Sequence, residues 1–180
     1  MSDNIIIFGQ EVSSETAYFN MVWLEEIHRD ELLKLKQLKQ LRHLNASFYK
    51  LNDVDLEVIG QLKSVELLDL VMTEVTDEGL KLLRPMVNLE ELRLKDNPQI
   101  TDAGLEHLSG LKNLKLIHLG NTSVTIAGLQ VILRNIALST LVIDSDFKES
   151  LNELGAMSLE YPSLEIIVKG TATVSNGEIY

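Results

Sequence analysis

The stretch from Val65 to Ala137 consists of three consecutive copies of one pattern. The copies cover residues 65–88, 89–113 and 114–137, with lengths of 24, 25 and 24 residues. They share a frame close to L-x-x-L-x-L-x-x-(T/N)-x-(V/I)-T-(D/I)-x-G-L-x-x-(L/I). A unit this short cannot bury its own apolar face, so like units must stack side by side to form a core. The repeat therefore restricts this part of the chain to a row of similar units.

Each copy joins the pattern of a strand to the pattern of a helix. Leu68 and Leu70 are two residues apart, so in a strand both side chains point to one face, which we expect to be the core. Leu80 and Leu83 are three residues apart and share one face of a helix, which closes the core from the other side. Each repeat is therefore predicted to be a strand, a turn and a helix.

Polar residues and glycines also recur at fixed places in the copies. After the strand comes a short polar residue that can hydrogen-bond the turn backbone, followed by a threonine suited to a helix N-cap. Next come an aspartate, whose negative charge interacts favourably with the helix dipole, and a glycine. These sets are Thr73, Asn97 and Thr122; Thr76, Thr101 and Thr125; Asp77 and Asp102; and Gly79, Gly104 and Gly128. Glycine in a helix costs roughly 1 kcal/mol relative to alanine. Its recurrence predicts a close approach of helix to sheet.

This frame resembles the leucine-rich repeat family. The T-D-x-G-L phrase is similar to the longer subclass, which has a true α-helix on the convex side. The resemblance implies an α/β solenoid with a parallel sheet on the concave face and α-helices on the convex face. It also implies a scaffold that binds many unrelated partners, because this fold does not specify one function.

The repeat extends towards the N-terminus in weaker form. Residues 41–64 keep the frame. Residues 17–40 keep part of it and are predicted to be a degenerate capping repeat, because terminal repeats are often atypical. Residues 4–11 are predicted to be an extra strand over the open edge, paired antiparallel with a strand at about 18–24. The alternative interpretation makes residues 14–27 a helix capped by Ser13 or Ser14, because short apolar runs are ambiguous.

Towards the C-terminus, residues 138–163 form a further repeat without the T-D-x-G-L phrase. In it, Leu151, Leu154 and Met157 carry the helix, and Phe147 replaces an apolar turn residue. A last strand begins at Leu164, and the tail contains a Ser-Asn-Gly turn signal. The tail folds back as a shielding hairpin in one interpretation and is loose in the other.

We therefore expect a single domain over residues 1–180. It divides into an N-terminal cap (1–40), regular repeats (41–137), and a degenerate repeat with a C-terminal cap (138–180).

Composition narrows the function classes. The net charge is −11, which argues against nucleic acid and anionic membrane surfaces as partners. Cysteine is absent, the four histidines are scattered, and no nucleophile elbow or phosphate loop is present. We predict no enzyme activity, no metal and no cofactor. The start MSDNIIIFGQ lacks a basic region and no run is long enough to span a membrane, so a cytoplasmic location is predicted.

The outward strand positions give the candidate binding surface. They form three rows across the sheet, because parallel neighbours lie ~4.8 Å apart. The rows are Phe19, His43, Leu67, Glu91, Leu116, Thr140 and Ile166; Met21, Asn45, Asp69, Arg93, His118, Val142 and Val168; and Trp23, Ser47, Val71, Lys95, Gly120 and Asp144. The partner-binding residues we predict are Leu67, Asp69, Val71, Glu91, Arg93, Lys95, Leu116 and His118.

Charges at the centre of an apolar setting are typical of a protein interface, and Arg93 and Trp23 are the first candidates for anchors. The alternative is a surface whose charges satisfy one another, with Asp69 and Arg93 paired across strands. Trp23 has its own alternative as a core residue of the cap.

The predicted function is therefore a non-catalytic protein-binding scaffold that uses its concave face and is monomeric. A specific form, suggested by the net charge, is a regulatory or neutralising partner of a basic protein. The alternative is a structural or assembly protein that self-associates through the solenoid ends.

Overall fold

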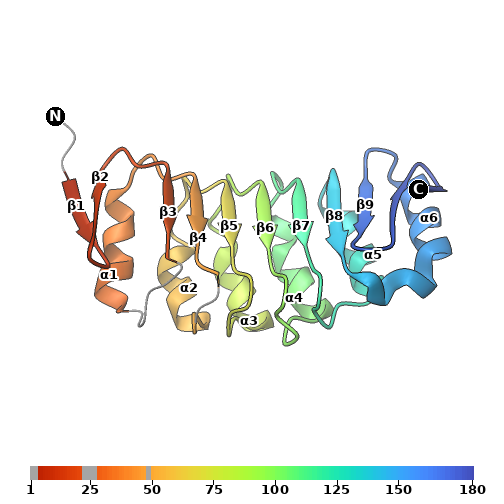
Figure 1. Ribbon diagram of the computed structural model, residues 1–180, viewed down its shortest axis with the longest axis horizontal. Coiled ribbons are helices and arrows are strands. Elements are labelled where there is room, and N and C mark those ends of the chain that lie inside the picture. Colours follow the sequence, from red (N-terminus) through yellow and green to blue (C-terminus); the bar gives the residue numbers. More distant parts are fainter. Residues whose placement is uncertain (1–3, 22–27, 48–49) are drawn as a thin grey trace.

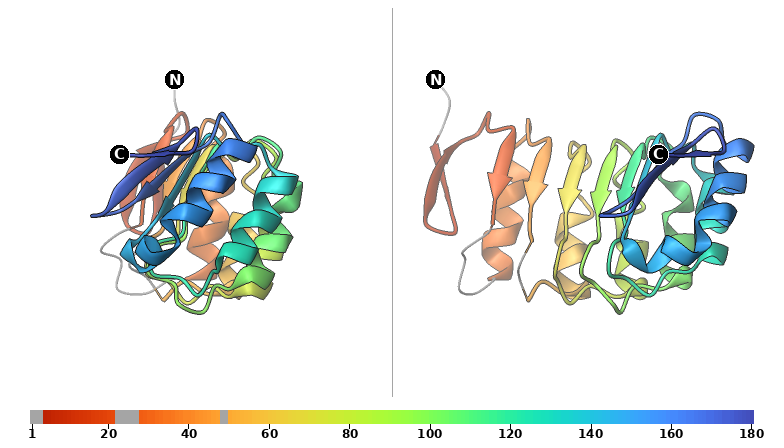
Figure 2. Two further views of the ribbon diagram at one scale, coloured as in Figure 1. Left: turned by 90° about the vertical axis from the view of Figure 1, so that its right-hand side faces the viewer. Right: turned by 45° about the vertical axis from the view of Figure 1, so that its right-hand side comes forward.

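The protein forms a row of strand–turn–helix units, with the strands on one face and the helices on the other (Figure 1). The computed structural model describes residues 4–21, 28–47 and 50–180. The side view in Figure 2 separates the strand layer from the helix layer, and the row is nearly straight in Figure 1. We call the sheet face that points away from the helices the concave face. This architecture is the predicted α/β solenoid.

Among the described residues, nine strands form one sheet, in the order β11-β10-β9-β8-β7-β6-β5-β4-β3. The strands from β3 to β9 pair in parallel. Their bounds are β3 Tyr18–Asn20, β4 His43–Asn45, β5 Leu67–Asp69, β6 Glu91–Arg93, β7 Leu116–His118, β8 Thr140–Ile143 and β9 Glu165–Val168. The helices between them are α1 Arg29–Lys34, α2 Asp53–Ile59, α3 Asp77–Leu80, α4 Asp102–His107, α5 Ile126–Asn135 and α6 Leu151–Glu160.

The predicted strand frame is confirmed in the regular repeats. Leu68 pairs with Leu92, which pairs with Ile117, and all three side chains are fully buried. Together with the helix leucines they form one continuous apolar core along the row. The convex side is only partly α-helical, because several helices continue as a 3₁₀ turn; α3, for example, is followed by Lys81–Leu83. The subclass with true convex α-helices therefore stays a prediction.

The polar turn residues behave as predicted. Thr73 and Thr122 each donate a hydroxyl hydrogen bond to the carbonyl three residues earlier, at Leu70 and Leu119. Asn97 is fully buried, and its amide donates to the carbonyls of Leu70 and Leu94 at 2.8 and 2.9 Å. Each of these bonds fixes the chain where it leaves the strand.

Consecutive repeats are joined by an additional link, which we call the inter-repeat clasp. The carboxylate of Asp53 accepts hydrogen bonds from the backbone and hydroxyl of Thr76, at 2.8 and 2.7 Å. The same pair of bonds joins Asp77 to Thr101 and Asp102 to Thr125. Each predicted N-cap threonine is thus held by the first-turn aspartate of the repeat before it.

The N-terminal strand pairing differs from the prediction. Strand β1 (Asn4–Ile7) pairs antiparallel with β2 (Gln10–Ser13) in a separate two-stranded sheet, not with β3. Phe8 and Gly9, both with positive φ, form the tight turn between them, which suits a two-residue hairpin. Residues 18–20 are a strand rather than part of a helix over 14–27, and residues 22–27 lie outside the described part.

The predicted register is wrong at the two terminal strands. Tyr18 pairs with His43, so Phe19 and Met21 point into the core and are buried instead of lining the concave face. At the other end Glu165 pairs with Thr140, so Ile166 and Val168 are buried and Ile167 faces outward. A slip of one residue moves every side chain to the opposite face of a strand.

The C-terminal tail is an ordered hairpin, as one of the two predicted alternatives has it. Strand β10 (Ala172–Ser175) pairs antiparallel with β9 and then with β11 (Glu178–Ile179). Asn176 and Gly177 have positive φ and form the turn. The hairpin buries Val174 and covers the edge of β9, which limits edge-to-edge aggregation.

Candidate functional site

The central row of the concave face brings three predicted site residues together. Asp69 pairs in register with Arg93, and Arg93 pairs with His118, on β5, β6 and β7. The guanidinium of Arg93 lies between two carboxylates: Nη2 is 2.6 Å from Glu91 Oε1 and Nη1 is 3.4 Å from Asp69 Oδ2. The predicted cross-strand ion pair is therefore present, and Glu91 makes the closer contact.

Asp69 is a buried but fully partnered carboxylate. It accepts hydrogen bonds from the Ser47 hydroxyl and from the backbone N–H of Val71, in addition to its contact with Arg93. A buried charge needs such partners, because an uncompensated one is costly. These contacts fix Asp69 and thereby the orientation of the Arg93 side chain above it.

His118, unlike Asp69 and Arg93 in the same row, has a buried side-chain nitrogen that is not hydrogen-bonded. Its side chain is 8% exposed, and its Nε2 atom has no hydrogen-bond partner. Burial, reinforced by the positive charges of Lys169, Lys95 and Arg93, lowers the pKa of His118 to about 4. The imidazole is therefore neutral near pH 7 and carries one buried polar nitrogen that a ligand or a water molecule can satisfy.

These residues line a hollow of about 400 Å³ on the concave face, which we call the concave pocket. Its apolar walls are Val71, Leu116, Val142 and Ile167. Its polar residues are Asp69, Glu91, Arg93, Lys95, His118 and Lys169. All the predicted site residues line it except Leu67, which lies on the same face in β5.

Ile167 and Lys169 were missed from the sequence because the register of β9 was placed one residue off. The signal that could have found them is the spacing between paired outward positions. This spacing is 25 residues from Thr140 to Glu165, whereas a frame with Ile166 outward needs 26. Trp23, predicted as a second anchor, lies outside the described residues.

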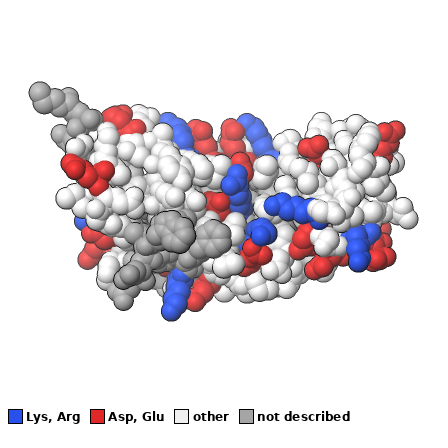
Figure 3. All heavy atoms as spheres, in the orientation of Figure 1, with Lys and Arg blue, Asp and Glu red and all other residues white. Residues whose placement is uncertain are grey.

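The charge on this face differs from that of the whole chain. Figure 3 shows Lys and Arg side chains gathered over the middle of the sheet face, although the net charge is −11. Within the pocket, the basic residues Arg93, Lys95 and Lys169 outnumber the acidic Asp69 and Glu91. Asp96, beside the pocket, pairs with Lys95, so Lys169 is the lining cation without a carboxylate partner among the described residues.

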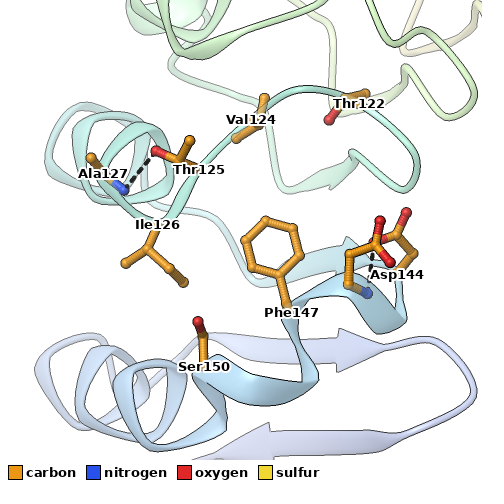
Figure 4. A pocket seen from close by; sticks show the side chains of 9 residues that line it. Thr122, Val124, Thr125, Ile126, Ala127, Asp144, Phe147 and Ser150 are labelled. Atoms are coloured by element: carbon orange, nitrogen blue, oxygen red, sulfur yellow. Dashed lines mark hydrogen bonds between the residues drawn. The ribbon is translucent and has the colours of Figure 1, made fainter.

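A second hollow of about 430 Å³ lies between the last two repeats. Figure 4 shows Phe147 projecting towards the loop that carries Val124, with Ile126 and Asp144 on either side. Ile126 stands where the preceding repeats have the aspartate of the inter-repeat clasp, so no clasp joins this helix to the next repeat. Phe147 is half-buried, packs against the core and lies in a 3₁₀ segment, Ser145–Ser150.

The described residues contain no group of three or more histidine, aspartate or glutamate side chains arranged to hold a metal ion. Among them, no helix is both long and apolar enough to cross a membrane.

A family model for the leucine-rich repeat matches residues 61–83 and 86–109. These two segments are therefore similar to leucine-rich repeats. They carry β5–α3 and β6–α4, so the concave pocket is built partly on strands of the matched segments. No curated protein sequence matches the chain.

Among solved structures, the chain is similar to the crystal structure of an internalin (inlF) from Listeria monocytogenes. The sequences are 17% identical, the TM-score is 0.49, and the match covers 87% of this chain. The match spans 56% of the internalin chain, so this chain corresponds to a little over half of that chain's length.

Proposed function

We propose that this leucine-rich repeat solenoid is a non-catalytic protein-binding scaffold and that the concave pocket is the centre of its binding surface. The observation that carries the proposal is the composition of the pocket. The pocket contains an arginine that lies between two carboxylates, together with two lysines and a buried histidine. Four apolar side chains surround these polar residues. Charged groups of both signs within apolar surroundings attract and discriminate protein partners.

The charge of the molecule gives two separate expectations. The net charge of −11 favours a basic partner for the molecule as a whole, so a neutralising or regulatory role toward a basic protein stays a prediction. In the concave pocket Lys169 has no carboxylate partner among the described residues, which favours an acidic group at the point of contact. A cytoplasmic location also stays a prediction.

Site-specific photo-crosslinking tests which surface is used. We propose placing p-benzoylphenylalanine at Leu67 on the concave face, at Glu106 on the convex face, or at Leu159 near the C-terminal end. The concave-face proposal predicts that one protein of the native source crosslinks at Leu67 and not at the other two positions. Crosslinks to the same protein at Glu106 or Leu159 alone would contradict it.

A second candidate function is self-association through the solenoid ends. Its support is the exposed apolar surface at both ends: Leu159, Ile179 and Tyr180 at one and Ile6 and Leu33 at the other. Light scattering at several protein and salt concentrations separates the two functions. A mass that stays that of one chain supports the predicted monomer, and a mass that rises with concentration supports assembly.

A further inference from the structure

The basic residues of the concave pocket are not equally engaged. Arg93 is held by Glu91 and Asp69, and the Lys95 amine pairs with Asp96 at 2.8 Å. Lys169 directly follows β9 and is exposed, and no carboxylate within the described residues pairs with it. Lys169 is therefore the pocket cation most available to a ligand.

A second, independent feature of the pocket also lacks a partner. His118 Nε2 is buried and makes no hydrogen bond, although buried polar atoms are nearly always satisfied. When the imidazole carries its proton on Nε2 this atom is a donor, and the pocket carboxylates of Asp69 and Glu91 are both engaged by Arg93. A hydrogen-bond acceptor from outside the chain would satisfy the hydrogen-bonding capacity of His118 Nε2.

Space beside this nitrogen is left by Gly120. A Cβ atom built on Gly120 would lie 3.3 Å from His118 Nε2 and 3.6 Å from the Lys95 Cγ atom. The same Cβ would lie 3.7 Å from the Asp144 Cβ atom, so the position is bounded by the imidazole, the Lys95 stem and Asp144, and it is empty because residue 120 has no side chain. A small oxygen-bearing group that enters beside the Lys95 stem comes within reach of Nε2.

We propose that the concave pocket binds the carboxylate of a glutamate or aspartate side chain from a partner protein, with Lys169 as counter-charge and His118 Nε2–H as hydrogen-bond donor. This inference rests on the proposed function and names the chemistry of its contact. A side chain is favoured over a free ion because Val71, Leu116, Val142 and Ile167 wall the pocket. Apolar neighbours of the acidic residue would cover these walls, whereas a lone anion would leave them exposed to water.

Titration with blocked peptides tests the proposal directly. The probes are N-acetylated, C-amidated Ala-Leu-Glu-Val-Ala and its Gln counterpart, followed through the imidazole NMR signals of His118. The Glu peptide should shift these signals saturably, with a dissociation constant lower than that of the Gln peptide by about tenfold or more, since a charge-assisted contact is lost. Equal binding of the two peptides, or no binding of either, would overturn the proposal.

Matched variants locate the contact. Lys169→Glu should abolish the saturable shift, whereas Lys148→Glu, the same charge change at an exposed site outside the pocket, should leave it intact. Gly120→Ala keeps every charge and fills the space beside Nε2, so it should weaken Glu-peptide binding under conditions where an unfolding curve shows the variant to be fully folded. Equal losses from Lys148→Glu and Lys169→Glu would show a general charge effect and contradict the pocket.

Two further arms separate related explanations. A Gln peptide with a free C-terminus presents a carboxylate only at its chain end, and binding as tight as that of the blocked Glu peptide would overturn side-chain recognition. If the Glu peptide fails to bind while a partner still crosslinks at Leu67, carboxylate recognition is refuted and the concave-face function stands.

Discussion

Gly79 lies directly against the carboxylate of Asp53, which belongs to the preceding repeat. A Cβ atom on Gly79 would be 2.1 Å from Asp53 Oδ1. Gly104 has the same relationship to Asp77, and Gly128 to Asp102, with distances of 2.3 and 2.1 Å. The recurring glycine was predicted to allow close approach of helix to sheet. Its neighbour is instead the aspartate of the inter-repeat clasp, which leaves no room for a side chain.

Gly79→Ala should therefore destabilise the protein because the new methyl group clashes with Asp53, and not because it weakens the helix. The methyl group forces the Asp53 carboxylate out of the clasp, at a cost of about 1–3 kcal/mol. In the Asp53→Ala background the same change should be neutral or stabilising by up to ~1 kcal/mol, because alanine is the better helix former. Denaturant unfolding of the wild type, both single variants and the double variant measures this coupling.

Gly110→Ala is the control for this cycle, because a Cβ atom at Gly110 meets nothing within 4 Å. Its unfolding free energy should change by less than about 1 kcal/mol in either background. Additive effects of Asp53→Ala and Gly79→Ala would contradict the clasp as the reason for the glycine.

Leu92 and Arg93 are neighbours in β6 that point to opposite faces. Leu92→Ala removes a fully buried side chain and should cost roughly 2–5 kcal/mol in the free energy of unfolding. Arg93→Ala should cost about 1 kcal/mol or less, because Asp69 keeps its bonds from Ser47 and Val71. Urea melts in which the two variants lose equal stability would refute the register of β6.

Asn97 should contribute strongly to the free energy of unfolding. Asn97→Ala removes both donors to the carbonyls of Leu70 and Leu94 and the acceptor for the Thr73 N–H, all within the buried turn. Leaving these groups unpaired should cost roughly 2–5 kcal/mol. The exposed Asn113 donates one bond to the Val87 carbonyl, so Asn113→Ala should cost under ~1 kcal/mol by the same chemical-denaturation assay. Similar losses for the two variants would contradict this role.

His118 should make stability depend on pH below neutrality. Its pKa is about 4 in the folded protein, lowered first by burial and then by Lys169, Lys95 and Arg93 and opposed by Asp69, against ~6.5 in an unfolded chain. Between these values the unfolded state binds a proton that the folded state does not. The free energy of unfolding should therefore fall as pH decreases from about 6.5 to about 4, by at most ~1.4 kcal/mol per pH unit.

The difference between wild type and His118→Gln isolates this effect, since the carboxylates titrate in both. Urea melts between pH 4.5 and pH 7 should show a steeper pH dependence for the wild type. Parallel curves for the two proteins would show that His118 does not change its protonation on unfolding.

The regular repeats could be predicted from sequence because their spacing is nearly constant. Leu68, Leu92 and Ile117 are where the frame places them, and so are Asp69, Arg93 and His118. The side chains of the terminal strands could not be assigned from the sequence, because a one-residue change in repeat spacing exchanges the buried and the outward face of a strand. Phe19 and Met21 at one end and Ile167 at the other were assigned to the wrong side.

The contacts between repeats were also beyond prediction from a single repeat. An aspartate in the first helical turn suggests a favourable interaction with the helix dipole, whereas Asp77 also holds Thr101 and excludes a side chain at Gly104. Such a partner lies 24 residues away and becomes evident only when the repeats are stacked.

The affinity of the captured partner for two charge-reversal variants tests the central claim most directly. Arg93→Glu inverts the charge at the centre of the concave face, and Glu106→Lys inverts an exposed charge on the convex side. Glu106→Lys should keep the wild-type unfolding midpoint, whereas Arg93→Glu should lower it because the new carboxylate faces Asp69 and Glu91, so both affinities are measured well below the lower midpoint. Titration calorimetry should find the partner's dissociation constant raised about tenfold or more by Arg93→Glu and almost unchanged by Glu106→Lys. The opposite ranking, with Arg93→Glu silent and Glu106→Lys abolishing the complex, would contradict a concave binding surface.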